Sequence, residues 1–250
     1  MTQATHPQAD PLVSIIIPVY NEEKNISILW DEISRAMRVQ NRTWEIVFVD
    51  DGSRDAGLDI IRRLATDEAR IGYVAFEENR GQSAAFAAGF REARGEIFVT
   101  LDSDLQNDPA DIPHMLDVYE REGDMIIGWR AKRRDTLIKR FSSKIANAVR
   151  NFLSRENVRD TGCSLKVMQA SLARRLPMFT GMHRFFPTLM KMQGAKVTEV
   201  QVNHRPRRYG HSKYGVWDRA FSAFYDLLAV RWMQARHIAY HIKERSRGQE

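Results

Sequence analysis

The chain has 250 residues, of which 43% are hydrophobic, and a formal net charge of +6. This length and composition allow a substantial buried core and exclude collagen-like and intrinsically disordered chains. The single cysteine, Cys163, excludes an intrachain disulfide and a cysteine-based metal knuckle, which fits a reducing compartment. Residues 1–12 lack the basic start and long apolar run of a signal peptide, so we expect a flexible tail on a cytoplasmic protein.

Three short apolar runs rich in β-branched residues predict strands at Val13–Val19, Glu45–Val49 and Ile97–Leu101. None of them alternates strictly, which is typical of strands that are covered on both faces. Apolar residues at helical spacing follow the first two runs. The first set is Ile26, Leu29, Ile33 and Met37, and the second is Leu58, Ile61, Leu64 and Ala65. This alternation of strands and helices predicts an α/β fold with a mostly parallel sheet.

Acidic residues follow two of the predicted strands. Asp50 and Asp51 come after the second strand, and Asp102 and Asp104 come after the third. In open α/β sheets, ligands bind outside the carboxyl ends of the strands, so we expect one site there. An Asp-x-Asp pair on such a turn can hold a hard divalent cation. The same residues also suit a turn or a helix cap, so their spacing alone leaves both interpretations open.

Positive charge is concentrated in residues 130–150, which hold eight Lys or Arg residues against one acid, Asp135. This segment carries +7, so the rest of the chain carries about −1. A dense basic patch implies an anionic partner, such as nucleic acid, anionic lipid or a phosphorylated substrate. Aromatic residues do not interleave with these charges as stacking platforms would, which argues against nucleic acid.

Two amphipathic helices are predicted in the second half of the chain. One spans Leu137–Leu153 and carries basic residues, and the other runs from Trp217 to Ile238 with Phe224, Leu228 and Trp232 in its apolar pattern. Each could pack on the core of its own domain or lie on an anionic membrane surface. No run of about 18 apolar residues occurs, so we predict no membrane-spanning helix.

Four motifs occur in a fixed order: Ser14–Glu23, Val49–Ser53, Asn79–Ser83 and Thr100–Pro109. In this order they resemble the family 2 glycosyltransferases of GT-A fold, over roughly residues 13–214. The resemblance implies a Rossmann-like, mostly parallel sheet flanked by helices, and a UDP- or GDP-sugar donor. We therefore expect a tail at 1–12, a catalytic domain at 13–215, and an amphipathic helix with a basic tail at 216–250.

The resemblance also assigns residues to the donor site. It implies a nucleotide-sugar pocket lined by Pro18, Tyr20, Glu22, Asp50 and Asp51. It implies a divalent cation, Mg²⁺ or Mn²⁺, held by Asp102, Asp104 and Gln106.

Later motifs narrow the branch of the family. The segments Ile126–Arg130, Asp160–Ser164 and Arg207–Tyr214 resemble those of the dolichyl- and undecaprenyl-phosphate glycosyltransferases. That branch implies inverting transfer to a polyprenyl phosphate by a protein bound peripherally at the cytoplasmic membrane face. The residues implied to bind the acceptor phosphate are Arg130, Arg140, Ser143, Arg207, Ser212 and Lys213. The set expected to carry catalysis is Asp102, Asp104, Asp160, Arg130 and Arg207.

Two alternatives remain open from the sequence. A family 2 transferase acting on a glycan hydroxyl would need a carboxylate base, for which Asp160 is the candidate, although a turn or helix cap explains Asp160 equally well. A non-enzymatic membrane-surface or nucleic-acid-binding protein would also explain the basic charge. His183 and Arg184 either border the acceptor site or are structural. The sequence fixes neither the sugar, nor the nucleotide, nor the oligomeric state, and it leaves a homo-oligomer open.

Overall fold

A computed structural model describes residues 12–131, 158–209, 216–238 and 244. In this part of the chain, seven strands form one sheet in the order β3-β2-β1-β4-β6-β5-β7. All neighbouring strands pair in parallel except β6, which runs antiparallel to β4 and β5. The strands are β1 (Val13–Val19), β2 (Trp44–Asp50), β3 (Ile71–Ala75), β4 (Ile97–Thr100), β5 (Met125–Trp129), β6 (Lys166–Gln169) and β7 (Val197–Gln201).

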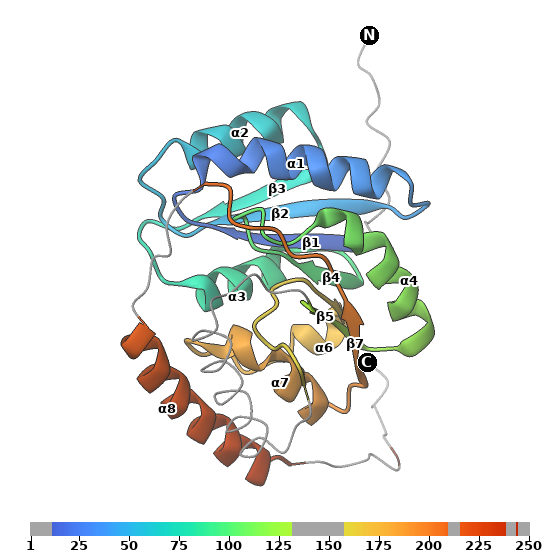
Figure 1. Cartoon of the computed structure of the whole chain (residues 1–250), viewed down its shortest axis with the longest axis vertical. Coiled ribbons are helices and arrows are strands. Elements are labelled where there is room, and N and C mark those ends of the chain that lie inside the picture. The colour runs from blue at the N-terminus through green and yellow to red at the C-terminus, as the bar shows by residue number, and fades with distance from the viewer. Residues whose placement is uncertain (1–11, 132–157, 210–215, 239–243, 245–250) are drawn as a thin grey trace, which may run out of the picture.

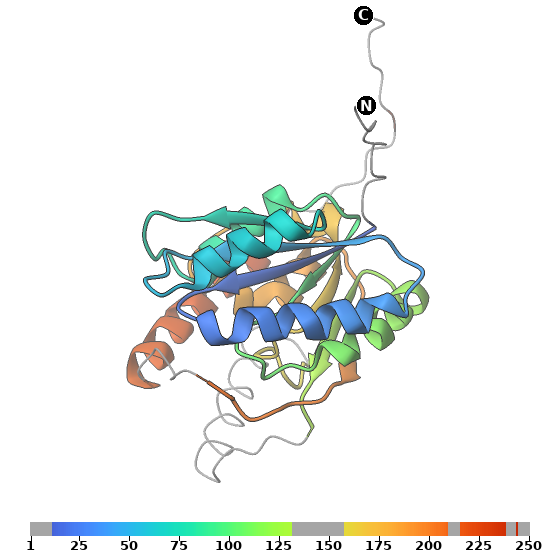
Figure 2. The same cartoon turned by 90° about the horizontal axis from the view of Figure 1, so that it is seen from above.

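Helices cover both faces of this sheet (Figure 1). The described helices are α1 (Glu23–Arg38), α2 (Gly57–Asp67), α3 (Gln82–Glu92), α4 (Ile112–Glu122), α6 (Ala170–Ala173), α7 (Phe186–Met192) and α8 (Val216–Ala235), with short 3₁₀ turns η1 (Pro109–Asp111) and η2 (Met182–Phe185). Helices α1, α2 and α4 pack on one face of the sheet, and α3, α6 and α7 pack on the other. Figure 2, seen from above, shows α1 (blue) and α2 (cyan) side by side on the near face of the sheet. The predicted α/β fold is confirmed.

Two apolar cores, one on each face, explain why the central strands read as continuous apolar runs. Alternate residues of a strand point to opposite faces, so Ile15 and Ile17 face α1 while Ile16 faces α3. Burying each large apolar side chain contributes about 1.5–3 kcal/mol to folding. Gly89 on α3 lies so close to Ile16 that an added Cβ would collide with it, so the glycine lets helix and sheet approach.

The predicted strands and helices of the first half agree with the structure, with small shifts at their ends. Strand β4 ends at Thr100, one residue before the predicted end at Leu101. The four apolar residues predicted to form the inner face of α1 are all buried: Ile26, Leu29, Ile33 and Met37.

Helix α8 packs on the second core through a face that the sequence pattern did not indicate. Leu227 and Val230 are buried in that core. Among the residues of the predicted apolar pattern whose side chains are described, Phe224 is 50%, Leu228 47% and Trp232 65% exposed. None of the described helices is both long and apolar enough to cross a membrane.

Candidate active site at the carboxyl ends of the strands

The predicted site residues meet at one edge of the sheet. Strand β1 lies between β2 and β4, and Val19 at its end pairs with Asp50 at the end of β2. Strand β4 ends at Thr100, two residues before Asp102. Because β6 runs antiparallel, it begins where the other strands end, and its first residue, Lys166, pairs with Thr100. The ends of β1, β2 and β4 and the start of β6 therefore lie at a single edge of the sheet, together with Asp50, Asp102 and Lys166.

Asp102 and Asp104 are each held by a side chain from elsewhere in the chain. The Nε2 of Gln82 donates to Oδ1 of Asp102 at 2.7 Å. Asp104 is buried, and its Oδ2 accepts a 2.7 Å hydrogen bond from Nη2 of Arg207. Its Oδ1 accepts from the backbone N–H of Gln106 at 3.1 Å. Leu105 has a φ of 61°, which is uncommon for a non-glycine residue and often occurs at functional sites.

The electrostatics of this pair fit a divalent cation. Burial, followed by the charge of Asp104, raises the pKa of Asp102 from 3.8 to about 6, while Ser164, Lys166 and Arg130 act in the opposite direction. A bound cation would offset the repulsion between the two carboxylates. Within the described residues, no group of three His, Cys, Asp or Glu side chains is placed to hold a metal ion. The two acids and Gln106 are fewer ligands than a hard divalent cation takes, so phosphate oxygens and water would complete its coordination.

The raised pKa of Asp102 leads to a prediction for the pH dependence of metal binding. A cation binds the ionised carboxylate, so above pH about 6 it displaces no proton, whereas below that pH it competes with one. We expect Mn²⁺ affinity, measured by electron paramagnetic resonance, to be level above this pH and to fall by up to about tenfold per pH unit below it. An affinity that stays constant down to pH 5 would contradict a role for Asp102 in binding the cation.

Residues predicted to line the nucleotide pocket lie along the ends of β1 and β2. Pro18 is in β1, and Tyr20 and Glu22 follow it directly before α1. Asp50 is buried, and its Oδ2 accepts from the N–H of Ser53 at 3.1 Å. Its Oδ1 has no hydrogen-bond partner among the described residues. A buried carboxylate oxygen in this state is available to a ligand.

Asp51, unlike Asp50, accepts hydrogen bonds on both of its carboxylate oxygens. Its Oδ1 accepts from the N–H of Arg80 at 2.6 Å, and its Oδ2 accepts from the N–H of Gly81 at 2.9 Å. The amide of Asn79 also donates to Oδ2, at 2.9 Å. Asp51 thus holds the loop that leads into α3, and its predicted contact with base or ribose stays a prediction.

Arg130 and Asp160 form a two-point ion pair. The Nε and Nη2 of Arg130 donate to the two carboxylate oxygens of Asp160 at 2.7 and 2.9 Å. Only 12% of the arginine side chain and 7% of the aspartate side chain are exposed. Asp160 is therefore the counter-ion of Arg130 in this structure, and it does not present the free carboxylate that a base for a hydroxyl acceptor would need.

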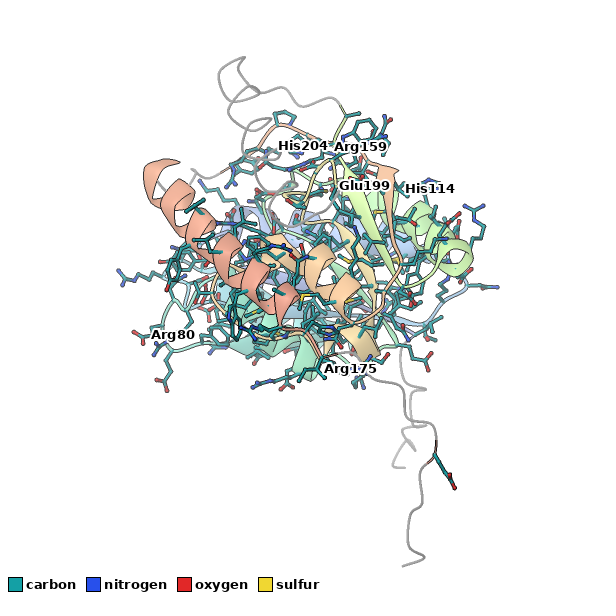
Figure 3. All side chains as sticks on the ribbon, turned by 90° about the horizontal axis from the view of Figure 1, so that it is seen from below. Arg80, His114, Arg159, Arg175, Glu199 and His204 are labelled. Atoms are coloured by element: carbon teal, nitrogen blue, oxygen red, sulfur yellow. The ribbon has the colours of Figure 1, made fainter. Side chains whose placement is uncertain are left out.

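Glu199 on β7 supports the turn that carries Asp160. Its Oε1 accepts from the N–H groups of Arg159 and Asp160 at 2.8 and 3.4 Å. The guanidinium of Arg159 lies 4.8 Å from the ring centroid of Trp129, at the end of β5. Figure 3 shows Arg159, Glu199 and His204 grouped on one side of the molecule. These contacts fix the position of the ion pair at the sheet edge.

Arg207 connects the two predicted parts of the donor site. The Nη2 of Arg207 contacts Asp104, and its Nη1 lies 3.7 Å from Oε1 of Glu22. The segment that carries it crosses the sheet edge, because Arg205 pairs with Glu32 of α1 and with Asp108 after β4. Arg207 is therefore in the site, and its predicted contact with an acceptor phosphate stays a prediction.

Lys166 is a residue of this edge that the sequence analysis did not identify. It is buried, its Nζ donates to the carbonyl oxygen of Cys163, and burial lowers its pKa. The charges of Asp102 and Asp160 act against that lowering. Its position after the Asp160–Ser164 motif is the signal that could have indicated it. Cys163 is buried, and burial raises its pKa.

Several predicted residues lie outside the described part of the chain. They are Arg140, Ser143, Ser212 and Lys213, together with the basic segment after Arg130 and the amphipathic helix predicted at 137–153.

A family model described as glycosyl transferase family 2 matches residues 14–177, which is more than half of the chain. The chain belongs to glycosyl transferase family 2. This result confirms the resemblance drawn from the four motifs, all of which lie within the matched residues.

Curated relatives of this family 2 chain carry polyprenyl-phosphate names. A dodecaprenyl-phosphate galacturonate synthase from Rhizobium johnstonii is 38% identical over 223 residues, covering 87% of this chain and 66% of the relative. An undecaprenyl-phosphate 4-deoxy-4-formamido-L-arabinose transferase from Yersinia pestis is 33% identical over 217 residues, covering 86% and 66%. The chain thus spans just under two thirds of the length of each of these relatives.

Solved structures share the fold at lower identity. Glucosyl-3-phosphoglycerate synthase from Mycobacterium tuberculosis, in complex with Mn²⁺, UDP-glucose and phosphoglyceric acid, has a TM-score of 0.64 at 19% identity, covering 90% of this chain and 80% of that one. A mannosyltransferase from Pyrobaculum calidifontis, in complex with GDP-mannose and Mn²⁺, has a TM-score of 0.62 at 21% identity, covering 95% and 67%. The GT-A architecture predicted for the family 2 chain is confirmed.

Proposed function

We propose that this chain transfers a sugar, with inversion, from a UDP- or GDP-sugar to a polyprenyl phosphate, using Mg²⁺ or Mn²⁺. The observation that carries the proposal is the arrangement at the sheet edge, where Asp102 and Asp104 lie beside buried or partly buried cations. Arg207 contacts Asp104 directly, and Arg130 and Lys166 act electrostatically on Asp102. The names of the curated relatives support a polyprenyl-phosphate acceptor.

On the donor side, Asp50 offers a buried carboxylate oxygen next to the segment that carries Tyr20 and Glu22. We assign these residues to the base and ribose of the donor. A cation held by Asp102, Asp104 and Gln106 would supply the positive charge that stabilises the departing nucleotide diphosphate. The Mn²⁺ complexes of the two structural neighbours support the need for such a cation.

On the acceptor side, a phosphate monoester has a second pKa near 6, so it is largely a dianion at neutral pH and needs no strong base. Its recognition requires arginine and lysine donors, and we assign this role to Arg130 and Arg207 among the described residues. The pairing of Asp160 with Arg130 argues against the hydroxyl-acceptor alternative, since that carboxylate is already committed to an ion pair.

For location, we propose that the protein lies peripherally on the cytoplasmic face of a membrane, through the outer face of α8. Phe224, Tyr225, Leu228 and Trp232 are exposed on this helix, while Leu227 holds the opposite face in the core. Aromatic and aliphatic side chains arranged in this way enter the boundary between lipid headgroups and acyl chains. Such a position would bring a lipid-linked phosphate to the protein.

This placement predicts the effect of charge on α8. The double substitution Leu228→Glu and Trp232→Glu is expected to weaken binding to vesicles of phosphatidylglycerol and phosphatidylcholine by at least about tenfold, because two apolar side chains no longer enter the lipid. Vesicle sedimentation measures the loss. Val39→Glu is the control, since Val39 is 79% exposed but belongs to the C-terminal end of α1. Equal vesicle binding by the unaltered protein, the double variant and the Val39→Glu control would exclude α8 as the lipid-contacting face.

Sugar transfer itself is tested by incubating the purified protein with labelled UDP- and GDP-sugars, a short polyprenyl phosphate, and either Mg²⁺ or Mn²⁺. We expect label from one donor to enter the organic phase, and chelation of the cation to stop it. Failure with every common UDP- and GDP-sugar would overturn the proposal.

A further inference from the structure

The first turn of α3 lies between two acids of the site and contacts both. Ahead of the helix, Asp51 accepts the backbone N–H groups of Arg80 and Gly81. At the first helical position, the side chain of Gln82 reaches across to Oδ1 of Asp102 at 2.7 Å. The donor-site acid after β2 is thereby connected to the predicted metal ligand after β4 through three consecutive residues.

Ser83, the next residue, fixes the same turn from its other side. It is only 8% exposed, and its Oγ accepts the N–H of Gly181 at 3.0 Å. The same oxygen lies 2.8 Å from Nδ1 of His183. Because Oγ accepts one hydrogen bond and can either donate to or accept from the imidazole, Ser83 joins α3 to the turn that begins η2. The contact with Nδ1 places His183 next to the first turn of α3.

Helix α8 covers the turn at Gly181. Gly181 has a φ of +88°, and a Cβ at this position would collide with the carboxylate of Asp226. A larger residue would therefore be strained and would also displace α8. The contacts run without interruption from α8, through Gly181 and Ser83, to the residue that binds Asp102.

We propose that Gln82 and Ser83 are positioning residues for Asp102, holding its carboxylate in the orientation that the cation requires. This inference rests on the metal site of the proposed function and gives a role to two residues of the Asn79–Ser83 motif that were not assigned one. The amide of Gln82 acts on Asp102 directly, and Ser83 acts by holding the turn that carries Gln82. Hydrogen-bond partners of metal ligands commonly change metal affinity by about 10- to 100-fold when they are removed.

The test measures Mn²⁺ binding rather than transfer. Electron paramagnetic resonance titrations of the full chain with Mn²⁺, in the presence of UDP or GDP, give the dissociation constant. We expect Gln82→Met to raise it by about tenfold or more. Gln169→Met is the matched control, because Gln169 ends β6 opposite Ile97, at the far edge of the sheet, and should leave the dissociation constant unchanged.

The double variant Gln82→Met, Ser83→Ala separates a positioning role from a general loss of stability. Ser83→Ala should weaken Mn²⁺ binding in the same direction as Gln82→Met, while Ser34→Ala, at a buried serine of α1, should not. Both substitutions act through one carboxylate, so the double variant should bind no more weakly than Gln82→Met alone. Additive losses, or a Gln82→Met variant that binds as tightly as the unaltered protein, would overturn the inference.

The outcomes also distinguish this inference from the proposed function. If the unaltered protein binds Mn²⁺ and nucleotide, and Gln82→Met weakens that binding, the inference stands even where no transfer to polyprenyl phosphate is found. If the unaltered protein binds no Mn²⁺ with either nucleotide, both the metal site and the inference are overturned. Where Ser83→Ala fails to fold, Ser83→Thr, which keeps the hydroxyl, should bind Mn²⁺ like the unaltered protein, and weaker binding would count against the role of Ser83.

Discussion

Replacing Asp104 by alanine is expected to reduce sugar transfer by at least about 1,000-fold, because a metal that stabilises a leaving group contributes several kcal/mol to the barrier. Asp104 is buried beside Arg207, so the substitution removes a carboxylate from the site and leaves a partly exposed arginine that water can solvate. Initial rates at saturating donor and cation measure the loss. Circular dichroism should show an unchanged fold.

Asp59→Ala is the control for Asp104→Ala, because Asp59 lies on α2 and its side chain is 71% exposed. It should transfer at the rate of the unaltered protein. A second readout is the thermal shift on adding Mn²⁺ and nucleotide, which should disappear in Asp104→Ala and remain in Asp59→Ala. Unchanged turnover of Asp104→Ala would rule out the metal role assigned to this residue.

Replacing Arg130 by methionine should lower the free energy of unfolding by about 3–5 kcal/mol, because it removes the arginine that pairs with the buried carboxylate of Asp160. Urea unfolding followed by circular dichroism measures this value. The same variant should lose transfer, since Arg130 is assigned to the acceptor phosphate.

The double variant Arg130→Met, Asp160→Asn separates the two roles of Arg130. Removing both charges takes away the buried carboxylate together with its arginine partner, and the asparagine oxygen can still accept the N–H of residue 130, which donates to Asp160 at 3.3 Å. We expect most of the lost stability to return while transfer remains low. Recovery of both stability and transfer would show that Arg130 serves only the fold, and its assignment to the acceptor would then be wrong.

The sequence predicted those elements whose local pattern matches their final surroundings. Strands β1, β2 and β4 are buried on both faces, so most of their residues are apolar and mark them clearly. The acids after β2 and β4 could be placed together because parallel strands end at the same edge. Helix α1 shows one buried face at helical spacing, and its four apolar positions are those predicted.

Other elements depend on partners that the local sequence does not reveal. Strand β3 lies at the sheet margin with its middle residues largely exposed, and its short run, interrupted by Gly72, was not predicted as a strand. Strand β6 takes its antiparallel direction from the strands on either side of it, β4 and β5. In α8, Leu228 and Trp232 follow the expected helical spacing, yet the core takes Leu227 and Val230 instead. Helical spacing shows that a face exists, and only the tertiary structure shows which face is covered.

Side-chain contacts across the site were also beyond the reach of the motifs. Gln82 meets Asp102 only because α3 begins beside the end of β4, and Asp160 meets Arg130 across 30 residues of sequence. Asp160 was predicted as a base for one alternative because its motif opens with an acid. The structure provides the counter-ion that a single sequence could not, and this changes the chemistry assigned to that acid.

The central claim is that the acceptor is a lipid phosphate, and one comparison tests it most directly. With the active donor and Mn²⁺, transfer to a short polyprenyl phosphate should be measured beside transfer to the polyprenol of the same chain length. We expect the phosphate to be glycosylated at least about 100-fold faster, because the alcohol offers no charge to the site arginines and needs a base that Asp160 does not supply. Equal transfer to both lipids, or transfer to the alcohol alone, would contradict the claim.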